Sequence, residues 1–336
     1  MIRACALVAL LSWGTAFAEP MRLRLATPAP EGSAYARELN SFSREVFRDT
    51  DSHVEAKWYM SGIAGDELTQ IDRMRRGQLD GAGLALGCDR LAPSLLAVRV
   101  VGLVRSRDEA SFVMRRSKAR IDEEMARAGF VELGLGTLGS VVAMTRTPVR
   151  TMADLRKLRL WVWDKDEIQL RLLRAMGLQP VPLPLEAGGP AYDEGRVDGF
   201  LAVPSAALAF QWSARTRYFL DFPLGEISAC FVMSQRAFDA LPLDERDVLV
   251  AAAGKLSARV EEVGRALDAA LLERLFERQG LKRLAPDAAF VDEFLEDAHR
   301  AREHLDEKMV PPELLSRALG WLADYRAEHP GQPTGH

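Results

Sequence analysis

Residues 21–27 read MRLRLAT, a stretch in which apolar and polar side chains alternate as they do in a half-buried β-strand. The strand must stop at Pro28 and Pro30, because proline donates no backbone hydrogen bond to a neighbouring strand. Ser33 follows as a typical helix N-cap, and an apolar stripe at helical spacing predicts a helix to about Thr50. This part of the chain therefore begins as strand, turn and helix.

The same order of elements repeats downstream. Residues 54–60 form a second predicted strand, Asp66 caps a helix that ends at Gly77, and residues 81–86 form a third, apolar strand. Strands that alternate with helices indicate a parallel sheet with right-handed crossovers. Ligands of such sheets bind beyond the carboxyl ends of the strands. The segments expected at the mouth of a site are therefore residues 28–33, 60–65 and 86–89.

The middle of the chain predicts a second α/β unit. Residues 130–145 form one long predicted strand that contains Gly134, Gly136 and Gly139, which indicate either a hinge between domains or β-bulges. The other predicted elements are a short helix over 154–157, a strand over 158–163, a helix over 166–176 and strands near 181–185 and 195–200.

A long helix is predicted near the end of the chain. Residues 244–279 carry apolar side chains at helical spacing, which corresponds to a helix of about 50 Å. Such a helix crosses both domains, breaks near Gly264 or packs against a partner, and we favour crossing. Residues 287–325 are also predicted to be helical, with Pro311 and Pro312 dividing them. The expected division is 19–140 plus 228–255 for lobe one, 141–227 plus part of 256–328 for lobe two, and a disordered tail over 329–336.

The N-terminal residues 1–18 have the features of a cleaved signal peptide. They contain Arg3, an apolar stretch too short to span a bilayer, and the small-residue end Ala16-Phe17-Ala18. We therefore expect an exported protein, most simply one in a bacterial periplasm.

The net charge of −4 does not indicate the basic surface that nucleic-acid-binding proteins carry. The scattered histidines predict no metal site, and no motif predicts a cofactor.

Two cysteines, Cys88 and Cys230, remain after the expected cleavage. An oxidising compartment permits a disulfide between them, but two buried thiols are the default interpretation for cysteines 142 residues apart. The sequence leaves both states open.

The segment DLRKLRLWVW at 154–163 places Trp161 and Trp163 on one face of a strand, because side chains two residues apart point the same way. Two large rings that face one way form either a core wall or one side of an apolar cleft. Asp164 and Asp166 follow directly, and we interpret them as helix N-terminal residues rather than ligand contacts.

Six local patterns, in order along the chain, together resemble the substrate-binding proteins of tripartite ATP-independent periplasmic (TRAP) transporters. They are LATP at 25–28 with Gly32-Ser33, SGIAGDE at 61–67 with RGQLDG at 76–81, TMADL at 151–155, GLQPVP at 177–182, GRVDG at 195–199 and AFDALP at 237–242. The resemblance implies an α/β fold like that of type II periplasmic binding proteins, with two lobes joined by hinge strands and a spanning helix. It also implies delivery of a small molecule to membrane permease subunits.

The resemblance includes a departure at the ligand site. The family's usual members hold an organic acid with an arginine on the strand after an Asp-Leu turn, and aligning on Asp154-Leu155 places Trp161 there. A second arginine of some relatives falls near Val141. An indole in place of a guanidinium removes the carboxylate anchor and supplies apolar surface. One branch of the family shares this Trp-Val-Trp strand, which implies a hydrophobic ligand and an additional helical-repeat periplasmic partner.

We therefore expect a ligand that is apolar or aromatic and lies in a cleft between the lobes. The predicted contacts are Trp161, Trp163, Trp212, Phe200, Tyr35, Met60, Leu86 and Val141. Asp198, in the Asp-Gly turn, is interpreted as a turn residue.

Two alternatives stay within the class of binding proteins. One is a ligand-presenting subunit of a sensor, and the other is a TRAP protein that binds a carboxylate through a different cation, such as Arg146 or Arg159. An enzyme is not expected, because the chain has no Gly-x-Ser-x-Gly or His-Glu-x-x-His motif and no histidine between His53 and His299.

Overall fold

The computed structural model describes residues 19–307 and 309–330, so the expected signal segment and residues 331–336 of the expected tail lie outside the described residues. Within these residues, nine strands form one mixed sheet in the order β2-β1-β3-β8-β4-β7-β5-β6, with β9 paired to β8. The strands are β1 Met21–Ala26, β2 Val54–Tyr59, β3 Gly81–Leu84, β4 Phe130–Thr145, β5 Arg159–Trp163, β6 Gln179–Leu183, β7 Gly199–Ala202, β8 Tyr218–Ser234 and β9 Lys282–Leu284.

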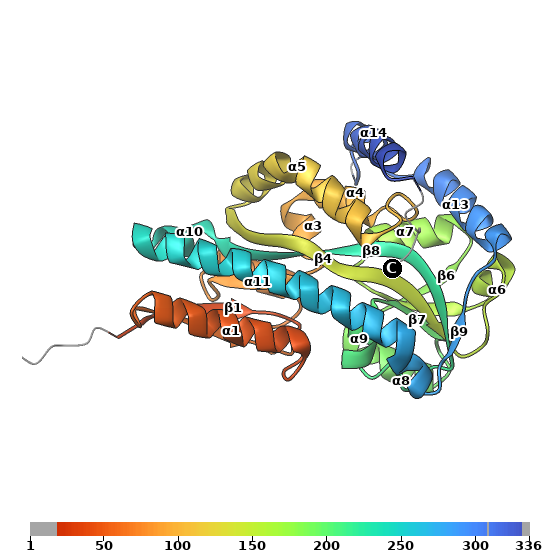
Figure 1. Ribbon diagram of the computed structural model, residues 1–336, viewed down its shortest axis with the longest axis horizontal. Coiled ribbons are helices and arrows are strands. Elements are labelled where there is room, and N and C mark those ends of the chain that lie inside the picture. Colours follow the sequence, from red (N-terminus) through yellow and green to blue (C-terminus); the bar gives the residue numbers. More distant parts are fainter. Residues whose placement is uncertain (1–18, 308, 331–336) are drawn as a thin grey trace, which may run out of the picture.

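The two ends of the sheet are parallel and its middle is antiparallel. β1 pairs in parallel with β2 and β3 at one end, and β5 pairs in parallel with β6 and β7 at the other, as the alternation of strands and helices predicted. Between them, β4 and β8 pair antiparallel along almost their whole length and run from one end of the molecule to the other (Figure 1). These two long strands therefore connect the two α/β ends.

The helices cover both faces of this sheet. They are α1 Ala34–Asp49, α2 Glu67–Arg75, α3 Cys88–Leu91, α4 Leu96–Arg99, α5 Arg107–Arg127, α6 Met152–Arg156, α7 Glu167–Ala175, α8 Gly188–Asp193, α9 Pro204–Ala209, α10 Gln235–Asp239, α11 Leu243–Ala270, α12 Phe276–Arg278, α13 Ala288–Arg302 and α14 Pro312–Glu328. None of the helices in the described residues is long and apolar enough to cross a bilayer.

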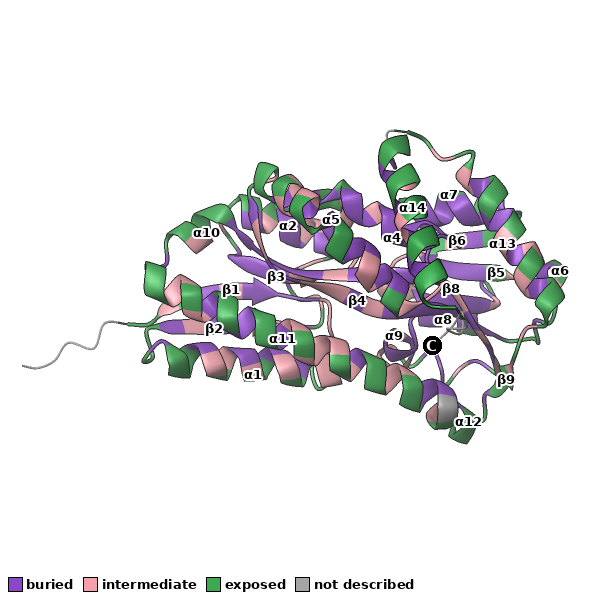
Figure 2. Cartoon of the chain, turned by 45° about the horizontal axis from the view of Figure 1, so that its top comes forward, coloured by how far each residue is buried: buried purple, intermediate pink, exposed green. Residues whose placement is uncertain are grey.

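The predicted first helix begins where its cap residue indicates. The Ser33 hydroxyl accepts a hydrogen bond from the Ala36 amide at 3.1 Å, so α1 starts directly after the loop that follows β1. Phe42 and Val46 on its inner face are fully buried, and burial of such a side chain contributes about 1.5–3 kcal/mol. Figure 2 shows this division, with buried residues facing the sheet and exposed ones facing outward.

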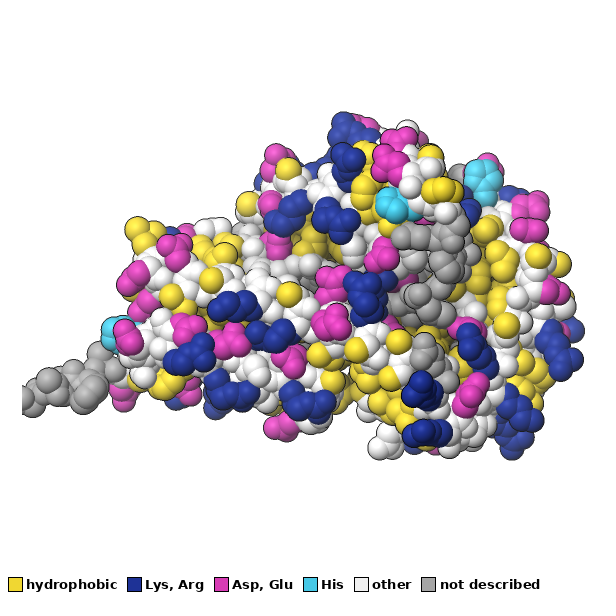
Figure 3. All heavy atoms as spheres, viewed as in Figure 1, with side chains coloured by type: hydrophobic (Ala, Val, Ile, Leu, Met, Phe, Trp, Pro, Cys, Tyr) yellow, Lys and Arg dark blue, Asp and Glu magenta, His cyan; other side chains and the backbone are white. Residues whose placement is uncertain are grey.

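The predicted long helix crosses both ends of the molecule. α11 packs against α1 and β4 and reaches α9 on the far side (Figure 1). It does not break at Gly264; its irregularity is instead a π-helical turn at Leu271–Leu275, after which α12 continues to Arg278. Arg259 on α11 lies 2.9 Å from Glu38 and 3.0 Å from Glu45 of α1. Basic and acidic side chains are interspersed across this face of the molecule (Figure 3).

The long strand β4 has the bounds predicted from the sequence, and its irregularities are bulges. Register shifts against β8 occur between Glu132 and Gly134, between Thr137 and Gly139, and between Val141 and Ala143. Since the strand also passes through both ends of the molecule, the bulges lie where a hinge was expected.

Two large elements were not predicted. β8 was missed because its sequence does not alternate regularly, and its Pro223 falls where the pairing with β4 is interrupted, as prolines in sheets do. α5 was missed because it is strongly polar and buries only scattered apolar residues such as Val113, Ile121 and Met125.

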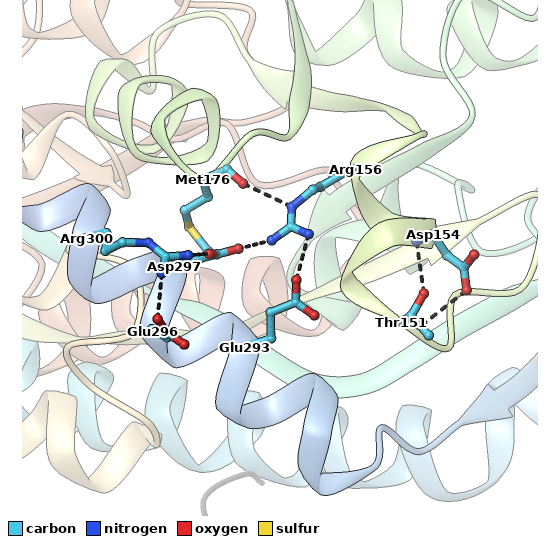
Figure 4. A network of polar contacts seen from close by, with 8 residues as sticks. All are labelled: Thr151, Asp154, Arg156, Met176, Glu293, Glu296, Asp297 and Arg300. Atoms are coloured by element: carbon cyan, nitrogen blue, oxygen red, sulfur yellow. Dashed lines mark hydrogen bonds and ion pairs between the residues drawn. The ribbon is translucent and has the colours of Figure 1, made fainter.

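The Asp-Leu turn at Asp154-Leu155 lies in α6, directly before β5. Thr151 and Asp154 form a capping box at the start of α6, with the Asp154 amide donating to the Thr151 hydroxyl at 3.1 Å. Arg156, at the end of α6, pairs with Glu293 at 2.7 Å and with Asp297, both on α13 (Figure 4). These contacts fix the short connection that leads into β5 and its two tryptophans.

A disulfide joins Cys88, the first residue of α3, to Cys230 on β8, with the two Cα atoms 5.9 Å apart. The structure thereby decides between the two cysteine states that the sequence left open. The bridge ties the loop after β3 to one of the two crossing strands.

The far end of the described chain is also held by contacts. His329, the first residue of the expected disordered tail, stacks on Tyr325 of α14 with ring centroids 4.2 Å apart. The division of the chain into lobes at 140/141 and 227/228 stays a prediction.

Candidate ligand-binding site

A cavity of about 560 Å³ lies where the carboxyl ends of the parallel strands meet the crossing strands. Its lining comes from the ends of β1, β3, β5 and β7, the starts of α1, α7 and α9, the middle of β4 and β8, and one side of α11. Two of the three segments expected at the mouth of a site contribute, through residues 28–33 and residue 86, whereas none of residues 60–65 lines the cavity, although Glu67 shortly after them does. The volume falls in the range of small-molecule sites.

Tryptophan dominates the wall of this cavity. Of the five tryptophans in the described residues, four line it: Trp58, Trp161, Trp163 and Trp212. Most other lining side chains are aliphatic or aromatic, for example Leu138, Phe210 and Phe231. The site therefore offers apolar and stacking contacts over most of its surface.

The two tryptophans of β5 point to the same face, as predicted. Trp161 is 3% exposed, and its ring centroid lies 4.5 Å from that of Trp212. Its indole Nε1 donates to the Pro184 carbonyl at 3.4 Å, so the polar edge of the ring is satisfied by the protein. Val162, which lies between Trp161 and Trp163 in β5, faces the opposite side and belongs to a different core cluster.

Trp212 is held in an aromatic stack behind the cavity wall. It lies parallel to Phe200 at 4.8 Å between ring centroids, and Phe210 stacks on it at 5.2 Å. Phe200 is fully buried and does not line the cavity, contrary to the prediction. Its position under Trp212, between that ring and Tyr192, explains the difference: it supports a lining residue.

Two further predicted contacts lie away from the cavity. Met60 is buried in the core between α1, α11 and the sheet, because it follows β2 at the sheet edge. Val141 is 2% exposed and faces the core on the opposite side of β4, directly before a bulge that shifts the register. Neither lines the cavity, whereas Tyr35 and Leu86 do.

Tyr35 makes a contact between two elements that lie far apart in the sequence. Its hydroxyl, in the first turn of α1, donates to the Ser205 hydroxyl of α9 at 3.4 Å. Burial is the main reason that the pKa of Tyr35 is raised above its ordinary value. Tyr35 and Ser205 both line the cavity.

The lining contains both basic and acidic side chains. Among the described residues, Arg37 is the one basic side chain in the lining, and it is exposed and donates to the Gly32 carbonyl at 3.2 Å. Three carboxyl groups also line the cavity: Glu67, Asp166 and Glu261. Glu261 pairs with Arg265 at 3.0 Å.

The two arginines considered as replacement anchors point elsewhere. Arg159 is exposed and pairs with Asp198 at 2.9 Å. Arg146 lies over the Tyr192 ring, 3.9 Å from its centroid. Neither residue lines the cavity. Asp198 accepts from the Arg159 amide at 3.0 Å, which agrees with its interpretation as a turn residue.

Glu67 shapes the loop that follows β3. Its carboxyl group is buried and accepts hydrogen bonds from the amides of Ala85, at 2.9 Å, and Gly87. Burial raises the pKa of Glu67 to about 7, although these two amides oppose the shift. The Glu67 carboxyl group therefore fixes the backbone of the cavity-lining segment 84–86.

A second buried group of charges lies next to Glu67. Asp166 caps α7 by accepting from the Gln169 amide at 3.2 Å, as expected, and it also pairs with Arg99 of α4. Asp89 lies 3.8 Å from the same guanidinium, and burial raises the pKa of Asp89 to about 7. One arginine thus faces two carboxyl groups, with Glu67 close by.

Sequence reasoning missed several lining residues, including Trp58, Phe231 and the α11 residues from Leu256 to Leu267. Trp58 lies near the carboxyl end of β2, which is a signal that could have found it. Phe231 could not be found, because β8 was not predicted. Among the described residues, no group of three or more His, Cys, Asp or Glu side chains is arranged to hold a metal ion.

Solved structures of TRAP solute-binding proteins share this fold. An extracytoplasmic solute receptor of Bordetella pertussis with pyroglutamic acid matches with a TM-score of 0.80 and 16% identity, covering 89% of this chain and 99% of that one. A protein of Haemophilus influenzae with L-gulonate matches with a TM-score of 0.82, 15% identity and coverage of 90% and 99%. A protein of Ralstonia eutropha with (S)-2-acetolactate matches with 0.82, 18% identity and the same coverage. The fold is therefore that of a type II periplasmic binding protein with two lobes.

The sequence comparisons agree with the fold. A curated solute-binding protein of Chromohalobacter salexigens is 28% identical over 178 residues, which are 51% of this chain and 50% of that protein, so the match spans about half the length of the relative. The sequence profile of the bacterial extracellular solute-binding protein family 7 matches residues 25–303. The chain therefore belongs to the bacterial extracellular solute-binding proteins of family 7.

Proposed function

We propose that this protein captures a small apolar or aromatic molecule between its two lobes and delivers it to the membrane subunits of a TRAP-type transporter. The observation that carries the proposal is the wall of four tryptophans around a cavity of about 560 Å³. Apolar area removed from water contributes about 25 cal/mol per Å², so such a wall favours an apolar ligand without any charged contact.

The distribution of charge argues against a small organic acid as the ligand. The structural relatives named above hold pyroglutamic acid, L-gulonate and acetolactate. In this chain, Trp161 occupies the position that the resemblance assigns to the carboxylate-binding arginine. A carboxylate next to it would lose its hydration without gaining a cation, which costs several kcal/mol. Arg37 is the one lining cation among the described residues, and three carboxyl groups share that lining with it.

Capture would use closure of the lobes around the ligand. Lining residues come from both ends of the sheet, and the hydrogen bond from Tyr35 to Ser205 joins α1 to α9 across the cavity. A ligand that contacts both lobes stabilises the closed form, because only that form provides all the contacts. The closed surface would then be the form that the permease subunits recognise.

The proposal includes export through the N-terminal segment 1–18 and action in the periplasm. Membership of an extracellular solute-binding family supports this location. The disulfide between Cys88 and Cys230 supports it too, because such bonds persist in oxidising compartments. The additional helical-repeat partner rests on the resemblance alone.

Tryptophan fluorescence tests the ligand class directly, because four of the five described tryptophans line the cavity. We expect naphthalene or indole to change the emission in a saturable way, whereas pyroglutamate and L-gulonate leave it unchanged. Replacing the half-buried Trp163 with alanine should weaken binding of the apolar probe by roughly tenfold, since about 1.4 kcal/mol of stacking and burial is lost.

Trp321→Ala is the matched control, because Trp321 is half-buried on α14 and does not line the cavity. It should leave the affinity for naphthalene unchanged. Saturable binding of pyroglutamate or L-gulonate, with no response to naphthalene or indole, would contradict the proposed ligand class.

A further inference from the structure

The cavity is elongated along α11. Leu256 and Leu267 of this helix both line it, and eleven residues of helix correspond to about 16 Å. Val260 and Glu261 line the stretch between them. The space therefore continues well beyond the pair of tryptophans on β5.

The residues that line the two ends of the cavity belong to, or pack against, two different hydrophobic cores. At one end, Leu267 packs against the core that contains Trp161 and Trp212. At the other end, Leu256 and Phe231 belong to the core between α1, α11 and the sheet. The lining residues at that second end are Leu39, Trp58, Phe231, Leu256 and Val260.

A glycine on β4 lies at the middle of this path. α11 runs along β4 so closely that a Cβ on Gly134 would come 2.0 Å from the Ser257 hydroxyl oxygen, and a Cβ on Gly264 would come 3.7 Å from the Leu138 carbonyl. Gly136 lies between these two contact points and lines the cavity. It points to the same face as Gly134, because the register from 134 to 137 is regular.

The space above Gly136 is empty. A Cβ at this position would meet no heavy atom within 4 Å, unlike one at Gly134. A larger side chain here would therefore project between the sheet and α11 and fill the passage between the two ends of the cavity.

We propose that the ligand carries a linear alkyl or acyl chain that passes over Gly136 and ends in the core between α1, α11 and the sheet. This inference rests on the proposed function, since it specifies which apolar molecule the site accepts. A long apolar space suits an unbranched chain, whereas a compact aromatic ring would occupy only the end at Trp161 and Trp212. Gly136 is then the residue that sets the permitted chain length.

The test is isothermal titration of the full-length mature protein with hexanoate, octanoate, decanoate and dodecanoate, and with the alcohols of the same lengths. We expect the Kd to fall about fourfold for each added methylene group, for acids and alcohols alike. In the variant Gly136→Val, decanoate and dodecanoate should lose at least tenfold in affinity, while hexanoate should stay within about twofold. Valine is chosen because it suits a strand.

Gly225→Val is the matched control. Gly225 lies on the neighbouring strand β8, a Cβ there also meets nothing within 4 Å, and it does not line the cavity. This variant should bind the whole series like the native protein. Thermal unfolding of both variants shows whether they fold.

Each outcome separates this inference from the proposed function. If indole binds but affinity does not rise with chain length, or if Gly136→Val weakens all lengths equally, the chain path is wrong and the apolar site stands. If neither indole nor any member of the series binds the native protein, both proposals are overturned.

Discussion

Trp161 is the residue on which the ligand class depends most. It lies on the cavity wall, is 3% exposed, and is packed so tightly that a Cβ on Gly188 would come 3.2 Å from its Nε1. The rings of Trp212 and Phe200 pack beside it. Its own indole N–H donates to the Pro184 carbonyl. Under the proposed function, a ligand at this position would meet an aromatic face.

The variant Trp161→Arg should exchange one ligand class for another. We expect it to weaken binding of naphthalene by at least tenfold, because apolar surface is replaced by a guanidinium, and to introduce measurable binding of a small organic acid such as pyroglutamate. Calorimetric titration of both probes measures the exchange. Unchanged binding of naphthalene would show that Trp161 does not contact the ligand.

The buried carboxyl groups make stability depend on pH. Burial raises the pKa of Glu67 from an ordinary 4.5 and of Asp89 from an ordinary 3.8, each to about 7. The folded protein therefore keeps protons that the unfolded chain has released, and its free energy of unfolding falls as the pH rises from about 4 to about 7 and then levels off. We expect a total fall on the order of 5–8 kcal/mol, measured by urea unfolding.

Glu67→Gln is the informative variant for this pH dependence. Glutamine keeps an oxygen for one of the two backbone amides, at Ala85 and Gly87, but no longer titrates. The fall in stability between pH 4 and pH 7 should become shallower in this variant. An unchanged slope would show that Glu67 is already ionised below neutral pH in the folded protein.

At the scale of elements, local signals predicted much of the fold. Ser33 and Asp66 begin helices as their side chains indicate, because a cap depends only on residues a few positions away. The short helix predicted over 154–157 begins earlier, at Met152. β8 could not be found in this way, because its pairing with β4 is decided by residues far away in sequence. The lining residues that β8 contributes, such as Phe231, were therefore missed as well.

The disulfide is the long-range element that the sequence could not decide. It joins α3 to β8 over a sequence separation of 142 residues, so it restricts the unfolded chain strongly. We expect the double variant Cys88→Ser, Cys230→Ser to lose roughly 2–5 kcal/mol in free energy of unfolding, as measured with urea. A reducing agent should destabilise the native protein to a similar extent and leave the variant unaffected. Two titratable thiols in protein taken from the periplasm would contradict the bridge.

At the scale of the whole molecule, the two-lobe architecture was predicted better than the site. Periodicity alone indicated two α/β units and the helix that crosses them, and both are present. The placement of single side chains was less accurate: Trp161, Trp163, Trp212, Tyr35 and Leu86 line the cavity, whereas Phe200, Met60 and Val141 do not. The bulges of β4 decide the case of Val141 and the aromatic stack under Trp212 decides that of Phe200, and neither has a local signal in the sequence.

The central claim is that the space between the lobes holds an apolar molecule. Native mass spectrometry of the protein purified from the periplasm of its own host, followed by denaturing extraction, tests this claim most directly. We predict a co-purifying hydrophobic molecule, with a linear chain if the path over Gly136 is correct, that denaturation releases. A small polar carboxylate in its place would contradict the account and would point to Arg37 as the anchor, since it is the one lining arginine among the described residues.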